Sequence, residues 1–267
     1  MERRFVKVEK GLGPQGHIAV VRFDRGDNIN ALSRQAMREL RDVPRDFEDD
    51  LETSVIILTG SAKAFSAGFD LKDHEGAKRG GLPLGESLLN QRLGPRLCKA
   101  WEQLEQVTIA AIEGWCVAGG LELALWCDLR ICTADSRFGC LERRWGVPLI
   151  DGGTQRLPRI IGLGRALDLV LTGRVVAADE AERIGLVTQV VEPEQHLVRA
   201  LALAETLAAF PQEAMLADRR STIEGIGRTF EDGLWLEARR GVPTVASSQA
   251  GAARFADGAG RSGRSAD

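Results

Sequence analysis

The chain has 267 residues, of which 44% are apolar, and its 35 Lys and Arg stand against 38 Asp and Glu, a formal charge of −3. This composition excludes a disordered, highly charged chain, because enough apolar surface is present to bury a sizeable core. The slight acidity argues against a nucleic-acid partner. The length fits one large domain, or one domain and a small second unit.

Nothing in the sequence indicates a membrane or a metal. No apolar run approaches the roughly 18 residues that span a bilayer, and no apolar stretch follows the charged start as in a signal peptide. We therefore expect a soluble, cytoplasmic protein. No two of its 5 cysteines form a Cys-x-x-Cys pair and its 3 histidines lie far apart. We expect reduced, buried cysteines and no metal site.

The first elements in chain order are two strands, at residues 5–8 and 17–23. The glycine-rich segment between them, residues 11–16, has the Gly-x-Gly-x-x-Gly spacing of dinucleotide-binding folds. That motif works only where a helix begins directly after it, because helix N–H groups bind the phosphates. A strand follows here, so we interpret the segment as a hairpin turn.

The next part alternates helices and apolar strands. A helix starts at Ser33, a suitable N-cap, and is interrupted at Pro44. Strands rich in β-branched residues alternate with helices, which predicts a mostly parallel, buried sheet. These are strands at 54–60, 108–114 and 129–133, with helices around 93–104 and at 121–126.

The last part is predicted to be helical. Strand-like residues occur there chiefly at 187–191. Helices are expected at 155–161, 164–172, 178–184, 194–210, 212–226 and 230–245. We therefore expect an α/β core over residues 1–190, a helical segment over 191–257 and a flexible tail over 258–267.

Two glycine-rich turns, within residues 57–72 and 112–124, each follow a buried strand and precede a helix start. Small residues there let a substrate approach the backbone, and a helix start leaves N–H groups without partners in the helix. Two such groups converging on one point would form an oxyanion hole. Each turn taken alone is also compatible with a simple strand-to-helix connection.

Several spaced motifs together resemble those of the enoyl-CoA hydratase/isomerase (crotonase) family, over nearly the whole chain. The resemblance implies an α/β, crotonase-like fold of repeated ββα units, with a mostly parallel core sheet and a helical C-terminal segment. The motifs are Asn30-Ala31-Leu32, Ser66-Ala67-Gly68-Phe69-Asp70, Ala118-Gly119-Gly120 and the segment from Gly152 to Leu157.

The resemblance also implies a set of site residues. The thioester carbonyl of an acyl-CoA would lie between the backbone N–H groups of Phe69 and Gly119. Glu142 would donate a proton to the α carbon, and Glu122 would orient and activate water. The coenzyme A part of the substrate would be bound by the segment that holds Ala67, Asp70, Leu71 and Lys72. No metal or redox cofactor is implied, because coenzyme A belongs to the substrate.

One turn departs from the family pattern. The usual Pro-Gly-Ala-Gly-Gly is replaced by Leu149-Ile150-Asp151-Gly152-Gly153. Ile150 stands where a glycine backbone can reach the catalytic water, and Asp151 adds a third carboxylate nearby. We interpret Asp151 as structural or as the cap of the following helix.

These observations favour an enoyl-CoA hydratase, which adds water reversibly and syn to a trans-2-enoyl-CoA to give a 3-hydroxyacyl-CoA. An isomerase or another lyase of the family is the alternative, favoured if Asp151 rather than Glu122 faces the substrate. An RNA-binding or scaffold protein of this fold would predict a basic stripe and dispensable glutamates, and the acidity argues against it. By resemblance we expect a homotrimer or homohexamer assembled through the C-terminal helices, although those helices could equally pack on their own core.

Overall fold

The computed structural model describes residues 3–72 and 100–257. The chain divides into two compact units, Met1–Leu207 and Ala208–Asp267. The first unit contains the α/β core, and it also includes nearly all of the helix after residue 191. The second unit contains the last helices. No helix of the described residues is long and apolar enough to cross a membrane.

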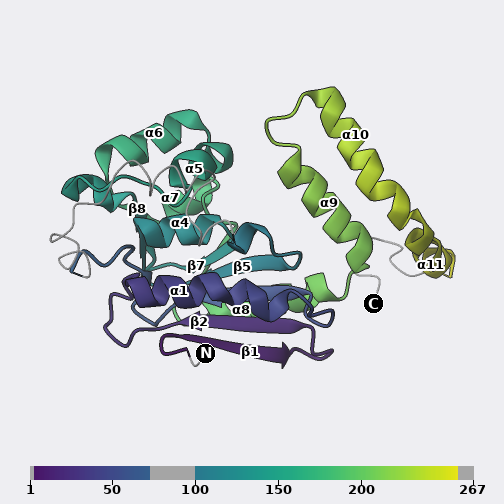
Figure 1. The fold of residues 1–267 in the computed structure, drawn as a ribbon, viewed down its shortest axis with the longest axis horizontal. Helices are drawn as coiled ribbons and strands as arrows, with labels where there is room; N and C mark the ends of the chain where they lie inside the picture. The colour runs from purple at the N-terminus through teal and green to yellow at the C-terminus, as the bar shows by residue number, and fades with distance from the viewer. Residues whose placement is uncertain (1–2, 73–99, 258–267) are drawn as a thin grey trace. The chain divides into compact units, whose positions relative to one another are not determined.

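A six-stranded sheet forms the centre of the first unit (Figure 1). Its first two strands pair antiparallel, and all other neighbours pair parallel. The predicted strands are confirmed, and the central ones are buried throughout, as expected for a sheet covered on both faces. In spatial order the strands are β1 (Val6–Leu12), β2 (Ile18–Phe23), β3 (Val55–Thr59), β5 (Val107–Ile112), β7 (Leu129–Thr133) and β10 (Gln189–Val191).

The predicted N-terminal hairpin is confirmed. Strand β1 pairs antiparallel with β2, and Gly16 N–H donates to the Gly13 carbonyl at 3.1 Å to close the turn. Strand β1 extends further than expected, to Leu12, by means of a register shift after Glu9. The glycine-rich segment therefore leads into a strand, and no phosphate-binding helix start follows it.

A second, small sheet was not expected from the sequence. Each of the strands β3, β5 and β7 is followed by a three-residue strand that joins this sheet, and β4, β6 and β8 lie parallel within it. This repetition is the ββα unit that the resemblance implies. The small sheet has the order β4 (Ala64–Ser66), β6 (Trp115–Val117), β8 (Arg137–Gly139) and β9 (Val176–Ala177).

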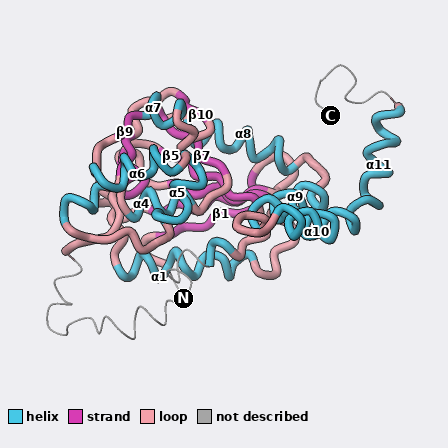
Figure 2. Tube along the Cα trace, turned by 90° about the horizontal axis from the view of Figure 1, so that it is seen from above, coloured by secondary structure: helices cyan, strands magenta, loops and turns pink. Residues whose placement is uncertain are grey.

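Helices cover both faces of the large sheet. Helix α1 (Arg34–Asp42) begins at Ser33, whose hydroxyl accepts the Ala36 N–H, which confirms the predicted cap. Figure 2 shows α1 and α8 (His196–Ala208) on opposite sides of the strands. The remaining helices of this unit are η1 (Val43–Phe47), α4 (Gly119–Leu125), η3 (Leu141–Trp145), α5 (Gly153–Ile161), α6 (Leu163–Thr172) and α7 (Ala178–Arg183).

Two expectations fall partly outside the described residues. The helix expected around 93–104 is described only from residue 100, and helical residues are seen there up to 102. Cys98 also lies outside. The other four cysteines are unpaired and buried, as expected, and burial raises their pKa values, so they are unreactive core side chains.

The second unit is a set of helices. The long helix expected at 230–245 ends earlier, and a further helix that the sequence did not indicate follows it. One guanidinium nitrogen of Arg240 donates to both carboxylate oxygens of Glu224, at 2.7 and 2.8 Å, which ties α10 to α9. The elements are α9 (Gln212–Glu224), α10 (Phe230–Gly241), η4 (Val242–Thr244) and α11 (Val245–Ala256).

Candidate active site

The carboxyl ends of the three short parallel strands bring the predicted motifs together. Strand β4 leads to Gly68 and Phe69, β6 leads to Gly119, and β8 leads to Glu142. Because β4, β6 and β8 are neighbours and run parallel, their ends meet at one edge of the small sheet. Segments more than 70 residues apart in the chain thus form one site.

The backbone N–H groups of Phe69 and Gly119 lie close together. A methyl group built on Gly119 would lie 3.6 Å from the Phe69 nitrogen, and one built on Gly68 would lie 2.7 Å from the Gly119 nitrogen. Leu32 exchanges backbone hydrogen bonds with Gly68 and Asp70, at 2.7 and 3.1 Å. Since successive N–H groups of an extended segment point in opposite directions, the Phe69 N–H points away from Leu32. Two backbone N–H groups this close together could both donate to one oxygen atom, as a two-donor oxyanion site requires.

Glycine is required where these two loops touch. Gly68 has φ of +81°, which a residue with a Cβ rarely adopts. A Cβ on Gly120 would lie 2.3 Å from the Ser66 carbonyl oxygen, so helix α4 can pack on β4 only because this residue has none. Both glycines therefore set the distance between the two backbone donors.

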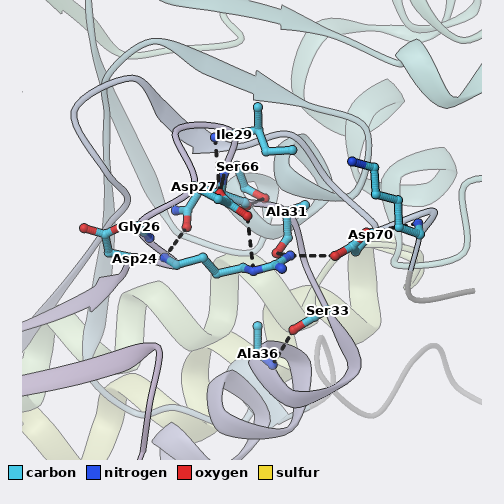
Figure 3. Close-up of polar contacts among 12 residues, drawn as sticks. Asp24, Gly26, Asp27, Ile29, Ala31, Ser33, Ala36, Ser66 and Asp70 are labelled. Atoms are coloured by element: carbon cyan, nitrogen blue, oxygen red, sulfur yellow. Dashed lines mark hydrogen bonds and ion pairs between the residues drawn. The ribbon is translucent and has the colours of Figure 1, made fainter.

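The Asn30-Ala31-Leu32 motif supports the loop after β4 (Figure 3). The Asn30 amide donates to the carbonyls of Phe23 and Phe65, at 2.7 and 2.9 Å, and so joins the ends of β2 and β4. The Ser66 hydroxyl donates to the Asn30 carbonyl at 2.8 Å and accepts the Gly68 N–H at 3.1 Å. These bonds fix the backbone that carries the Phe69 N–H.

An ion pair holds the other end of the same loop. Arg25 donates to the Asp70 carboxylate at 2.7 Å and to the Ala31 carbonyl at 2.9 Å, and its Nε lies 3.3 Å from Asp27 (Figure 3). Asp70, expected to bind substrate, is thus engaged in an ion pair that braces the loop.

The remaining residues expected to bind coenzyme A surround this loop. Ala67 is half-buried and its N–H donates to the Ile29 carbonyl at 2.9 Å. Leu71 and Lys72 are exposed, and the Lys72 N–H donates to Asp70 at 3.0 Å. The Lys72 ammonium is therefore carried at the surface, next to the site, where an anionic group could reach it.

Glu122 is buried in the first turn of helix α4. Its Oε1 accepts the backbone N–H groups of Asp151 and Gly153, at 2.9 and 2.7 Å. Burial, the charge of Asp151 and, more weakly, that of Glu142 raise the pKa of Glu122 to about 8 against the lowering effect of the two N–H donors. A carboxyl group that holds a proton near neutral pH is suited to acid–base chemistry.

Glu142 lies in η3 and has a different environment. The residue is buried, and neither carboxylate oxygen has a hydrogen-bond partner among the described residues. Burial raises its pKa, while its own backbone N–H and the charge of Arg143 act in the opposite direction. A buried carboxyl group without a partner is costly for folding, so its presence points to a ligand that completes it.

The two arginines after Glu142 brace η3. Arg143 donates to the Val170 carbonyl at 3.2 Å, and Arg144 donates to the Gly173 carbonyl at 2.9 and 3.2 Å. Both acceptors lie at the C-terminal end of α6, where carbonyls lack partners within the helix. The guanidinium groups therefore cap α6 and fix η3 in place.

The turn at 149–153 corrects one expectation. Asp151 is not the N-cap residue of helix α5, because that position is held by Gly152, with φ of +97°. The Asp151 backbone instead binds Glu122 through its N–H and the Trp126 indole through its carbonyl, at 2.7 Å. These backbone contacts are structural, which was the other role expected for Asp151.

Sequence reasoning did not single out Arg25 or Trp126, both of which act on the site loops. A signal for Trp126 was present in its spacing, four residues after Glu122, which places both side chains on one helix face. No signal paired Arg25 with Asp70, because the ion pair joins segments 45 residues apart. Among the described residues no group of three or more His, Cys, Asp or Glu could hold a metal ion.

The candidate site thus combines two neighbouring backbone N–H groups with two buried carboxyl groups, an arrangement that could move protons next to a carbonyl group. A sequence model of the enoyl-CoA hydratase/isomerase family matches residues 13–257. The chain is 37% identical to a probable enoyl-CoA hydratase of Rhizobium meliloti over 228 residues, which cover 84% of this chain and 85% of that protein. It is 34% identical to a short-chain-enoyl-CoA hydratase of Clostridium acetobutylicum over 245 residues, or 89% and 88% of the two chains.

Solved structures agree with this match. An enoyl-CoA hydratase from Bacillus anthracis superposes with a TM-score of 0.84 at 32% identity, over 95% of this chain and 96% of that one. A monofunctional enoyl-CoA isomerase from M. smegmatis gives a TM-score of 0.71 at 29% identity, over 86% and 98%. The chain belongs to the enoyl-CoA hydratase/isomerase family, and the expected crotonase-like fold is confirmed.

Proposed function

We propose that the protein is an enoyl-CoA hydratase, which adds water reversibly and syn to a trans-2-enoyl-CoA and forms a 3-hydroxyacyl-CoA. The observation that carries the proposal is the pair of buried carboxyl groups, Glu122 and Glu142, beside the two backbone donors of Phe69 and Gly119. The names of the hydratases in R. meliloti and C. acetobutylicum support the same reaction.

The parts of the site match the steps of hydration. Addition of water to the β carbon pushes negative charge onto the thioester oxygen, which the N–H groups of Phe69 and Gly119 would stabilise. Glu122 would orient and deprotonate the water, and Glu142 would deliver a proton to the α carbon. The residues near Ala67 and Lys72 would bind the coenzyme A part. Hydration transfers protons and no electrons, so the proposal requires no redox cofactor.

The two carboxyl groups must together hold one proton for this reaction. One group acts as the acid and the other as the base, so activity is lost when the pair gains a second proton or loses its only one. The raised pKa of Glu122, at about 8, places the loss of the last proton on the alkaline side of neutrality. We expect a bell-shaped pH profile of kcat/KM whose alkaline limb lies near that value.

Substitution of each glutamate by glutamine tests the proposal. We expect Glu122→Gln and Glu142→Gln each to lower kcat for hydration of a 2-enoyl-CoA by about 100-fold or more, because each removes a proton-transfer group. The matched control is Glu113→Gln, which alters a buried glutamate outside the site that likewise accepts a backbone N–H, from Glu194 at 2.9 Å. Near-normal hydration by either site variant would refute the two-glutamate mechanism.

A double-bond isomerase is the second candidate, and one observation favours it. Asp151 lies near enough for its charge to raise the pKa of Glu122, so a third carboxylate borders the site. An isomerase moves a proton from one carbon of the acyl chain to another and needs no water. Conversion of a 3-enoyl-CoA faster than hydration of a 2-enoyl-CoA, with loss of that conversion in Asp151→Asn, would favour this candidate.

We also propose that the protein assembles into a homotrimer or homohexamer through its second unit. The helices α9 and α10 contain no buried residue. Large apolar side chains are exposed along α10, η4 and the start of α11, and burying them is worth about 25 cal/mol per Å² of apolar surface. These side chains are Phe230, Leu234, Trp235, Val242 and Val245.

A further inference from the structure

Helix α4 directs two side chains at the same turn. Glu122 and Trp126 are four residues apart, so they lie one above the other on one face of the helix. Glu122 accepts the N–H groups of Asp151 and Gly153, at 2.9 and 2.7 Å. The Trp126 indole N–H donates to the carbonyl of the same Asp151 at 2.7 Å. Through these two side chains, α4 is hydrogen-bonded to two backbone N–H groups and one backbone carbonyl of the turn.

The indole is in close contact on two sides. A methyl group built on Gly152 would lie 2.9 Å from Cζ2 of Trp126, so the ring packs directly against the backbone of the turn. The Arg156 guanidinium lies 3.7 Å from the ring centroid, a cation–π contact, and donates to the Leu125 carbonyl at 3.2 Å. The ring can change its orientation only if the turn or Arg156 moves.

From these contacts we propose that Trp126 is a positioning residue, which fixes the Asp151–Gly153 turn and through it the carboxyl group of Glu122. The inference rests on the proposed role of Glu122 in hydration. Without the indole N–H, the Asp151 carbonyl loses this hydrogen bond, and the turn can move away from α4. The two N–H donors then no longer hold Glu122 Oε1 in place, and a misplacement of about 1 Å can cost about 100-fold in rate.

The same contacts predict how the pKa of Glu122 responds. The N–H donors stabilise the ionised carboxylate, so they lower a pKa that burial and the charges of Asp151 and Glu142 raise. Weakening these hydrogen bonds removes the lowering effect, and the pKa of Glu122 rises above about 8. The alkaline limb of the pH profile must then move to higher pH.

The test is the Trp126→Phe variant of the full chain, which keeps an aromatic ring against Gly152 and removes the N–H donor. We expect kcat for hydration to fall about 10- to 100-fold. We expect KM to stay within about twofold, because the proposed coenzyme A contacts are on another loop. We also expect the alkaline limb of the pH profile to move up by about half a pH unit or more.

The chain offers a matched control in Trp101→Phe. Trp101 likewise donates its indole N–H to a backbone carbonyl, that of Leu40, at 2.9 Å, but it is fully buried and packs beneath α1 in the core. Its variant loses an equivalent hydrogen bond. A general loss of stability would lower the melting temperature of both variants, whereas only Trp126→Phe should change kcat and the pH profile.

The outcomes separate the inference from the proposed function. If Glu122→Gln is inactive and Trp126→Phe keeps the wild-type kcat and alkaline limb, the positioning role is refuted and the function stands. If Glu122→Gln remains active, the proposed function itself fails. Should Trp126→Phe not fold, Arg156→Gln takes its place, since it keeps the indole and removes the stacked cation. A rise of its alkaline limb supports the inference, and an unchanged limb refutes it.

Discussion

At the scale of single residues, the two glutamates differ in what surrounds them. Glu122 is held by two backbone donors and faces the negative charges of Asp151 and Glu142. Glu142 has no hydrogen-bond partner among the described residues, and burial raises its pKa against the opposing charge of Arg143. We therefore expect a titration near pH 8 to belong to the pair of glutamates and its position to depend on Asp151.

Removing the charge of Asp151 is expected to move the alkaline limb of the pH profile to lower pH. The Asp151 carboxylate disfavours the ionised form of Glu122, so Asp151→Asn should lower the pKa of Glu122 from about 8. The pair then loses its proton at lower pH, and we expect a shift of about half a unit or more in kcat/KM profiles. This direction is opposite to that expected for Trp126→Phe.

The control for this prediction is Asp179→Asn, which removes one negative charge from a side chain that is 79% exposed on α7. Screening by solvent makes its effect on the site negligible. An alkaline limb that stays in place in Asp151→Asn, or that moves equally in both variants, would contradict the dependence of the site on Asp151.

At the scale of elements, sequence patterns predicted the strands of the large sheet but not those of the small one. Strands β3 and β5 are apolar runs of five and six residues bounded by turns, which a pattern can reveal. Strands β4, β6 and β8 have three residues each, too few to show a period. Their pairing depends on contacts between distant segments.

The same limit explains which site residues could be predicted. Glu122, Glu142, Phe69 and Gly119 were found through motifs whose spacing resembles a family. The ion pair of Arg25 joins separate elements, and no local pattern encodes it. The spacing of Trp126 places it on the helix face of Glu122, but it does not indicate that the ring contacts the Asp151 turn. The capping role expected for the Asp151 side chain was wrong because Gly152 adopts the left-handed conformation and becomes the N-cap itself.

The packing of helix α4 on strand β4 leads to a prediction for two glycines. Gly120 and Gly164 are each the second residue of a helix, α4 and α6. A Cβ on Gly120 would lie 2.3 Å from the Ser66 carbonyl oxygen, whereas nothing lies within 4 Å of one on Gly164. Gly120→Ala should push α4 away from β4, lower the melting temperature and reduce kcat by about 100-fold, because the Gly119 donor moves with the helix.

Gly164→Ala is the matched control and should have the opposite effect on stability. Alanine favours a helix over glycine by about 0.5–1 kcal/mol, so a rise of a few degrees in melting temperature is expected with unchanged kcat. Equal melting temperatures for the two variants would show that α4 is not packed on β4 as described.

At the scale of the whole molecule, the two compact units differ in how they use apolar residues. The first unit buries its central strands β3 and β5 completely, and its core continues into α4, α5 and α6. In the second unit, α9 and α10 contain no buried residue although α10 carries Phe230, Leu234 and Trp235. A helix pair without its own core gains little from folding alone, so its apolar surface is expected to be covered by another chain.

Association through this surface is measured by size-exclusion chromatography with light scattering. We expect a mass of about three or six times the 29.0 kDa of one chain. Trp235→Glu places a charge on a side chain that is 68% exposed on α10, and it should lower that mass, because burying an unpaired charge in an interface costs several kcal/mol. Leu51→Glu, at a residue that is 95% exposed in the first unit, is the control and should leave the assembly intact. A wild-type monomer would contradict the proposed assembly, and equal masses for wild type and Trp235→Glu would show that this part of α10 lies outside the interface.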